Sequence, residues 1–164
     1  MPEVATSTSI FAIQANLHKL SLAAKNLNEL SDKLTAEVSE IEDTINKLNL
    51  GITAYVVFEA WSDDTGLERG AWRLEYGKLM GKWGFIINYS TEDLGRGPDN
   101  EFTENWLFKD SPREKRLRAV EKIPELLAAL VKKSDEVATE LNTRVKYVQD
   151  LATSFSFSQD GSKK

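Results

Sequence analysis

The apolar positions near the N-terminus follow one strict rule. From Ile10 to Leu48, apolar or small residues recur at alternating steps of three and four, and in this series only Ser31 is polar. A 3.5-residue period sustained over several heptads is typical of a coiled coil, in which one stripe of the helix packs against a partner helix. Asn49 and Gly51 follow, and both residue types commonly end helices. The pattern predicts a helix over about residues 8–49.

A second helical pattern occupies residues 111–156. Ser111 with Glu114 three residues later is typical of a capping box at a helix start. Pro124 removes a backbone donor and clashes with the preceding turn, so it predicts either a kink or a break. The polar residues 157–164 are expected to form a flexible tail. After the proline, the apolar series is Leu127, Leu130, Val137, Leu141, Val145, Val148, Ala152 and Phe155.

Between the two helices, residues 52–109 are rich in aromatic and β-branched side chains that alternate with polar ones. This period of two is typical of strands with one buried face. A short connection over residues 79–81, with Gly81 free to take positive φ, favours a hairpin. The segment predicts an antiparallel meander of three or four strands, with Trp72 and Trp83 on its apolar face. Whether the tryptophans are core or interface residues stays open at this point.

The expected fold class is therefore α+β. The two helices fold back as a long antiparallel hairpin, a coiled coil, and the meander is inserted at its tip, within a single domain over residues 1–164. In this arrangement Leu17 faces Val148 and Leu27 faces Ala138. It also brings the acidic end of the first helix near the basic start of the second, which offsets unfavourable helix dipoles.

The composition indicates in which cellular compartment the protein is expected, but not what the protein does. The 164 residues carry a net charge of −5 and no cysteine, so neither a disulfide nor a thiolate metal site is available. The N-terminus lacks a basic region followed by an apolar core, and no stretch reaches the roughly 20 apolar residues of a membrane span. We expect a cytoplasmic protein that does not enter a membrane.

No residue pattern in the chain indicates an enzyme. The single histidine, His18, lies beside the heptad stripe, and no nucleophile or carboxylate partner is signalled for it. The glycine-rich segments match neither a P-loop nor a dinucleotide-binding fingerprint. We therefore expect no catalytic residue, cofactor or metal.

Acidic residues gather in two loops, 62–69 and 91–103, which a meander places at one end of the sheet. They lack the spacing of an EF-hand. Ordinary solvated loops are the simplest interpretation, and a surface for a basic protein partner is the alternative. The basic start of the second helix is an alternative site for nucleic acid, which the net negative charge disfavours. The acidic residues are Asp63, Asp64, Glu68, Glu92, Asp93, Asp99 and Glu101.

Apolar residues also lie beside the heptad stripes, and two helices cannot cover so wide an apolar surface. The hypothesis is a non-enzymatic, scaffold-like assembly protein that forms a homo-oligomer, most simply a dimer of two hairpins. A binding module for one of the partners named above is the alternative. The residues expected to mediate self-association are Phe11, Leu22, Leu30, Leu126 and Val131, with Leu117 beside them.

Overall fold

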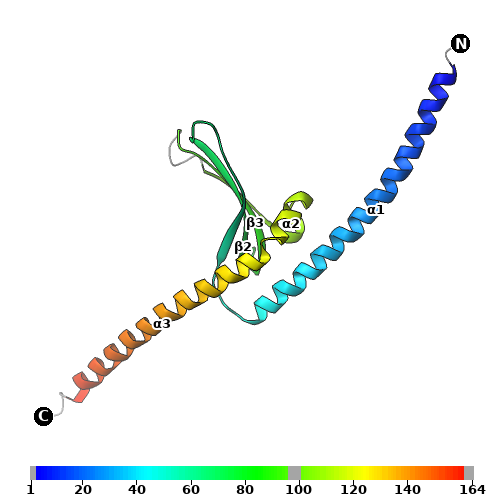
Figure 1. Cartoon of the computed structure of the whole chain (residues 1–164). Helices are drawn as coiled ribbons and strands as arrows, with labels where there is room; N and C mark the ends of the chain where they lie inside the picture. Colours follow the sequence, from blue (N-terminus) through cyan, green and yellow to red (C-terminus); the bar gives the residue numbers. More distant parts are fainter. Residues whose placement is uncertain (1–2, 96–100, 161–164) are drawn as a thin grey trace. The chain divides into compact units, whose positions relative to one another are not determined.

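The computed structural model describes residues 3–95 and 101–160, with side chains described for residues 10–95 and 101–155. The chain divides into two compact units, residues 1–44 and 45–164. Helix α1 (Glu3–Lys47) provides the first unit and contributes its last turn to the second. The second unit also contains a four-stranded sheet and the helices that follow it (Figure 1).

The sheet is the antiparallel meander that the alternating pattern predicts. Its strands are β1 (Ala54–Ser62), β2 (Glu68–Leu79), β3 (Lys82–Asp93) and β4 (Glu101–Leu107). They pair in sequence order, β1-β2-β3-β4, and each neighbouring pair is antiparallel. Strands β2, β3 and β4 extend into the two segments, 62–69 and 91–103, that the sequence predicts as acidic loops.

Positive φ angles mark the predicted hairpin turn and the predicted end of the first helix. Met80 and Gly81 connect β2 to β3 with φ values of 50° and 83°, the backbone of a type I′ hairpin turn. Asn49 and Gly51 have φ values of 50° and 64° just after α1, where left-handed residues end a helix. Both sequence signals are confirmed.

The predicted second helix is divided into two. After a short 3-10 helix, η1 (Phe108–Asp110), the chain forms α2 (Arg113–Val120) and then α3 (Ile123–Asp160). Pro124 lies in the first turn of α3, where its missing N–H costs no helical hydrogen bond, so it marks a break and not a kink. The capping-box prediction is wrong, because the Ser111 hydroxyl donates to the carbonyl of Phe108.

The helix boundaries also differ from the predictions at both ends of the chain. Helix α1 begins at Glu3 and not near residue 8. Helix α3 extends to Asp160, so residues 157–160 of the predicted flexible tail are helical, and residues 161–164 lie outside the described part of the chain.

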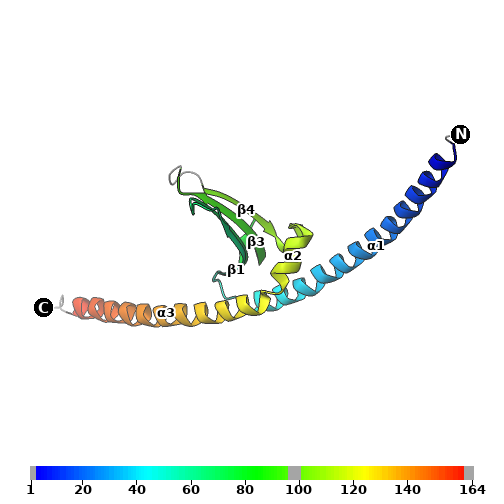
Figure 2. The same cartoon turned by 45° about the horizontal axis from the view of Figure 1, so that its top comes forward.

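Helices α2 and α3 pack against one end of the sheet, and the strands extend beyond them (Figures 1 and 2). Helix α3 contacts β1 and β2, and α2 contacts β3. The buried side chains between these layers are Leu74, Tyr76, Phe85 and Ile87 from the sheet and Phe108, Ala119, Ile123, Leu126 and Leu130 from the helices. The Tyr76 hydroxyl donates to Asn46 Oδ1 at 2.7 Å, and Asn46 Nδ2 donates to the carbonyl of Trp83 at 3.2 Å. These two bonds fix the last turn of α1 to the sheet.

The predicted helical hairpin is wrong. Leu17 and Val148, expected to face each other across it, are each 59% exposed, and Leu27 is 49% exposed. The apolar start of α3 packs against the sheet instead. The physical reason is that the apolar face of a four-stranded sheet needs a cover, and Ile123, Leu126 and Leu130 supply it.

Candidate functional site

The second half of α3 presents a stripe of exposed apolar side chains. Every residue from 138 to 155 is exposed, and Figure 2 shows this part of α3 continuing beyond the sheet. Four of the large apolar side chains among them follow a 3.5-residue period, with Ala152 between the last two, which places them on one side of the helix. They are Leu141, Val145, Val148 and Phe155, and Tyr147 and Leu151 lie beside them.

Helix α1 presents a similar stripe. Every residue from 10 to 30 is exposed, including the apolar positions of the heptad series. The large ones are Ile10, Ile13, Leu17, Leu20 and Leu27. Exposed apolar stripes of this extent are unusual in monomeric proteins and mark interaction surfaces.

Of the residues predicted to mediate self-association, four lie on the surface and one does not. Phe11, Leu22 and Leu30 are exposed on α1, and Val131 is 62% exposed on α3. Leu126 is completely buried, at 0% exposure. Its assignment to a surface is wrong, because it faces the sheet and forms part of the core.

The acidic residues at the far end of the sheet form the turns and strand ends there. Asp63 accepts hydrogen bonds from the Thr65 hydroxyl and, at 3.0 Å, from the Glu68 N–H. Together with contacts to the neighbouring backbone, they hold the pKa of Asp63 below its usual value. Asp93 Oδ1 accepts from the Gly95 N–H at 2.9 Å in the same way. These contacts give the two carboxylates structural roles within tight turns.

The remaining acidic positions are strand residues or lie outside the described chain. Glu92 pairs with Arg69 across β2 and β3 at 2.6 Å, and Glu101 is the cross-strand neighbour of Glu92. Glu68 begins β2, and Asp64 is an exposed turn residue. Asp99 falls among residues 96–100, which the structure does not describe. Among the described residues, no group of three or more His, Cys, Asp or Glu side chains could hold a metal ion.

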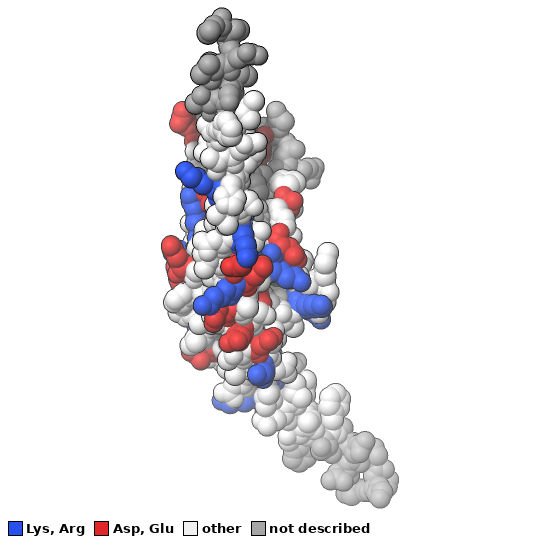
Figure 3. Space-filling model, turned by 90° about the vertical axis from the view of Figure 1, so that its right-hand side faces the viewer, with Lys and Arg blue, Asp and Glu red and all other residues white. Residues whose placement is uncertain are grey.

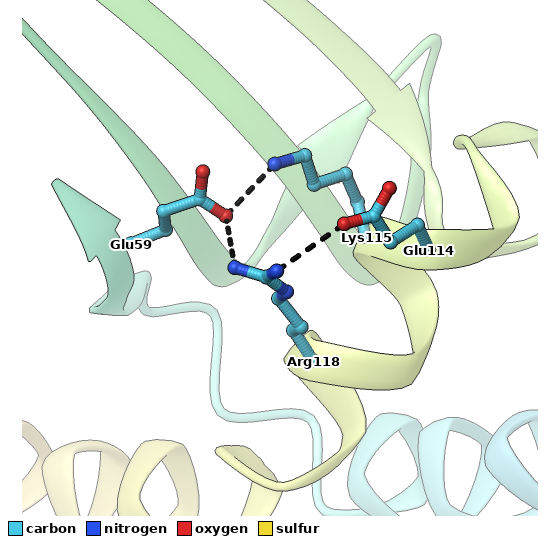
Figure 4. Close-up of polar contacts among 4 residues, drawn as sticks. All are labelled: Glu59, Glu114, Lys115 and Arg118. Atoms are coloured by element: carbon cyan, nitrogen blue, oxygen red, sulfur yellow. Dashed lines mark hydrogen bonds and ion pairs between the residues drawn. The ribbon is translucent and has the colours of Figure 1, made fainter. Parts of the chain in front are cut away.

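A charged cluster that the sequence did not indicate joins β1 to α2. Lys115 Nζ and Arg118 Nη1 both donate to Glu59 Oε2, at 2.8 and 2.9 Å, and Arg118 also pairs with Glu114 (Figure 4). The hydrogen bond from Lys115 is the main cause that holds the pKa of Glu59 below its usual value. Lys115 Nζ also lies 4.5 Å from the centre of the Trp72 ring, which adds a cation–π contact. The cluster fixes α2 on the sheet.

A β-bulge creates this arrangement. The register between β1 and β2 shifts between Val57 and Glu59, so that Phe58 is the extra residue and Glu59 becomes the cross-strand partner of Trp72. Without the extra residue, strict alternation would turn Glu59 toward the opposite face. A bulge has no reliable signature in a single sequence, so the sequence could not reveal the partners of Lys115 and Arg118.

The sheet also has a shallow hollow of about 520 Å³ near its far end. Trp61, Arg69 and Arg73 line it, together with Glu92 and Glu101. Arg73 is held in place by its Nη1, which donates to Asn88 Oδ1 at 3.3 Å and Ser90 Oγ at 2.8 Å. The two arginines are offset by the two glutamates, so the hollow has no excess charge that would select a charged ligand.

Charge on the face drawn in Figure 3 is mixed. Lys and Arg side chains are interspersed with Asp and Glu, without a separate basic or acidic field. No helix in the described part of the chain is long and apolar enough to cross a membrane. Comparisons with protein-family models, with curated proteins and with solved structures find no match to this chain.

Proposed function

We propose that this protein is a non-enzymatic assembly protein that joins copies of itself through its long helices. The observation that carries the proposal is the exposure of apolar heptad residues over residues 10–30 of α1 and 138–155 of α3. The sheet, α2 and the start of α3 pack together, and the exposed second half of α3 continues beyond them.

Helix stability gives the first argument. Isolated helices are marginal in water, and most helical stability in proteins comes from packing an apolar face. In a single chain, residues 138–155 are exposed on every side and gain little from packing. A helix that buries this stripe against another copy gains that packing energy, so assembly and helix formation support each other.

The expected affinity of self-association can be worked out from the apolar surface that it would bury. Burying the exposed half of a large apolar side chain contributes about 1 kcal/mol. Val131, Leu141, Val145, Val148 and Phe155 in two copies therefore contribute roughly 10 kcal/mol, against an association cost of about 4–15 kcal/mol. The stripe of α3 alone gives modest affinity, and a contribution from α1 strengthens the assembly.

The two alternative binding roles have less support. Asp63 and Asp93 hold turns, and Glu92 is paired with Arg69, so these carboxylates are already engaged. At the basic start of the second helical region, Lys115 and Arg118 are engaged by Glu59. Among the described residues, these contacts reduce the charge that either surface offers to a partner.

Analytical ultracentrifugation of the full chain tests the proposal. We expect the sedimenting mass to rise above the 18.4 kDa of one chain as the concentration rises from about 1 to 100 µM, a span centred on the affinity that the energetics allow. Circular dichroism should show helix content rising over the same range. A constant 18.4 kDa with constant helix content would refute self-assembly.

A matched pair of variants locates the contact. The double variant Leu20→Glu with Leu141→Glu places carboxylates in both stripes and should shift the protein to a monomer, because each charge would be buried without a partner. The control, Asn26→Glu with Thr143→Glu, adds the same charge at helix positions outside the stripes. It should assemble like the parent, and equal loss of assembly in both variants would contradict a role for the stripes.

A further inference from the structure

We infer that α3 pairs with α3 of a second copy as a parallel coiled coil with identical residues facing each other. The inference rests on the proposed self-assembly and specifies the helix, its partner and its orientation. It starts from the fact that α3 has two separate apolar faces. One face packs on the sheet through Ile123, Leu126 and Leu130, which are all buried.

The other face is an unbroken heptad stripe, which we call the α3 stripe. From Leu127 its residues follow alternating steps of four and three to the end of the described side chains, and the large ones among them are exposed. The same 3.5-residue period continues past the sheet, so fold packing does not explain it. The members are Leu127, Val131, Ser134, Ala138, Leu141, Val145, Val148, Ala152 and Phe155.

The residue types in the α3 stripe favour two parallel strands. Taking the steps of four and three as heptad positions, Val131 and Val145 fall at position a, and Leu127 and Leu141 fall at two of the five d positions. The other d positions hold Ser134, Val148 and Phe155. β-branched residues at a with leucine at d are the combination that favours parallel dimers. The small residues Ala138 and Ala152 occupy the other a positions, where they let the helices approach closely.

The flanking residues favour the same orientation. In a parallel pair, Arg144 at position g lies beside the partner's Gln149 at position e, a contact without like charges. In the antiparallel pair that overlaps over residues 131–155, Arg144 meets the partner's Arg144. This like-charge contact disfavours the antiparallel arrangement.

Helix α1 is less suited to the same parallel pairing. Its heptad places Glu37 at position g and Glu42 at position e, so an in-register parallel pair sets Glu37 beside the partner's Glu42. This like-charge contact points to α3 as the helix that sets the orientation of the assembly.

The absence of native cysteine makes disulfide crosslinking a clean test. Val131→Cys and Val148→Cys are made separately and oxidised under mild conditions. In a parallel, in-register pair each cysteine faces its own copy, within the Cα separation of about 4.4–6.8 Å that a disulfide needs. We expect both variants to form a covalent dimer, and the outward-facing control Thr143→Cys to remain largely uncrosslinked.

An antiparallel pair cannot give this result. In an antiparallel pair, only residues near the twofold axis lie beside the same residue of the partner. Val131 and Val148 are about 25 Å apart along the helix axis, so at most one of the two variants could crosslink. One crosslinking variant would therefore overturn the parallel orientation. Native tryptophan fluorescence of the oxidised variants verifies that the sheet, which carries all four tryptophans, remains folded.

The outcomes separate this inference from the proposed function. If neither α3 variant crosslinks but Leu20→Cys does, and the parent still sediments above 18.4 kDa, the chain assembles through α1 and the inference is wrong while the proposed function stands. If the parent is a monomer at every concentration, both fail. A second measurement uses Val148→Glu, which should weaken assembly by about 100-fold or more, because two carboxylates would meet in the stripe. Equal assembly of Val148→Glu and Thr143→Glu would also overturn the inference.

Discussion

Leu126 and Val131 lie five residues apart on α3, and we expect Leu126 to stabilise the fold and Val131 to mediate assembly. Substituting each by alanine tests these two roles. Leu126 is 0% exposed and packs against the sheet, whereas Val131 is 62% exposed on the α3 stripe. Leu126→Ala should therefore damage the fold, and Val131→Ala should leave the fold intact and weaken assembly.

The expected change in the free energy of unfolding follows from how deeply each side chain is buried. Removing three carbon atoms from a fully buried leucine costs about 2–5 kcal/mol, which combines lost burial with the cavity left behind. That is a large part of the roughly 5–15 kcal/mol that stabilises a typical domain. Val131→Ala removes little buried area, and alanine has the higher helix propensity, so its effect on the free energy of unfolding should stay within about 0.5 kcal/mol.

Urea unfolding followed by tryptophan fluorescence measures both effects. Each strand carries one tryptophan, namely Trp61, Trp72, Trp83 and Trp106, so the signal reports the sheet directly. Measurements at low protein concentration keep assembly from contributing. With a urea dependence of about 1–3 kcal/mol per molar, Leu126→Ala should lower the midpoint by roughly 1 M or more.

Two results would refute this division of α3. If Leu126→Ala unfolds at the same urea concentration as the parent, the packing of α3 on the sheet is not what stabilises the core. If Val131→Ala loses as much stability as Leu126→Ala, the stripe is part of the fold and is not available for assembly.

Three further predictions concern the sheet. Glu59→Gln should lower the free energy of unfolding by about 1 kcal/mol at pH 7, because Lys115 loses its charged partner. The lowered pKa of Glu59 stabilises the parent above about pH 4.5, and this stability is lost as the pH falls through the lowered pKa. Acid titration of the variant should lack this loss. Partial burial raises the pKa of Glu75, so the ionised carboxylate destabilises the fold. Glu75→Gln should therefore raise the thermal midpoint well above the raised pKa and give no gain well below pH 4.5, where the carboxyl is protonated in both states. Equal gains at both pH values would contradict the burial argument. Gly70→Val should displace the indole of Trp61, because a Cβ at residue 70 would clash with its Nε1, and unchanged emission from a Trp61-only variant would show that the indole does not lie there.

Local signals in the sequence determined the secondary structure well. The strict 3.5-residue period of α1, the alternation in the strands, the turn at Gly81 and the helix end at Asn49 all depend on neighbours within a few positions. Backbone sterics and side-chain periodicity act over that range, so one sequence suffices to predict such elements. The candidate surface was also visible in part, because Phe11 and its neighbours on α1 were identified as excess apolar residues.

Only the tertiary structure decided which apolar face packs where. A heptad pattern states that a helix has a partner, but it does not distinguish another helix in the same chain, the face of a sheet or a second copy of the protein. The face of α3 that contains Leu126 packs against the sheet, whereas the stripe that contains Leu141 and Val148 remains exposed. Apolar surfaces far apart in the chain compete for the same contacts, and a bulge in β1 turns Glu59 toward Lys115. Both effects depend on residues that are distant in sequence, and the periodicity of one segment carries no information about them.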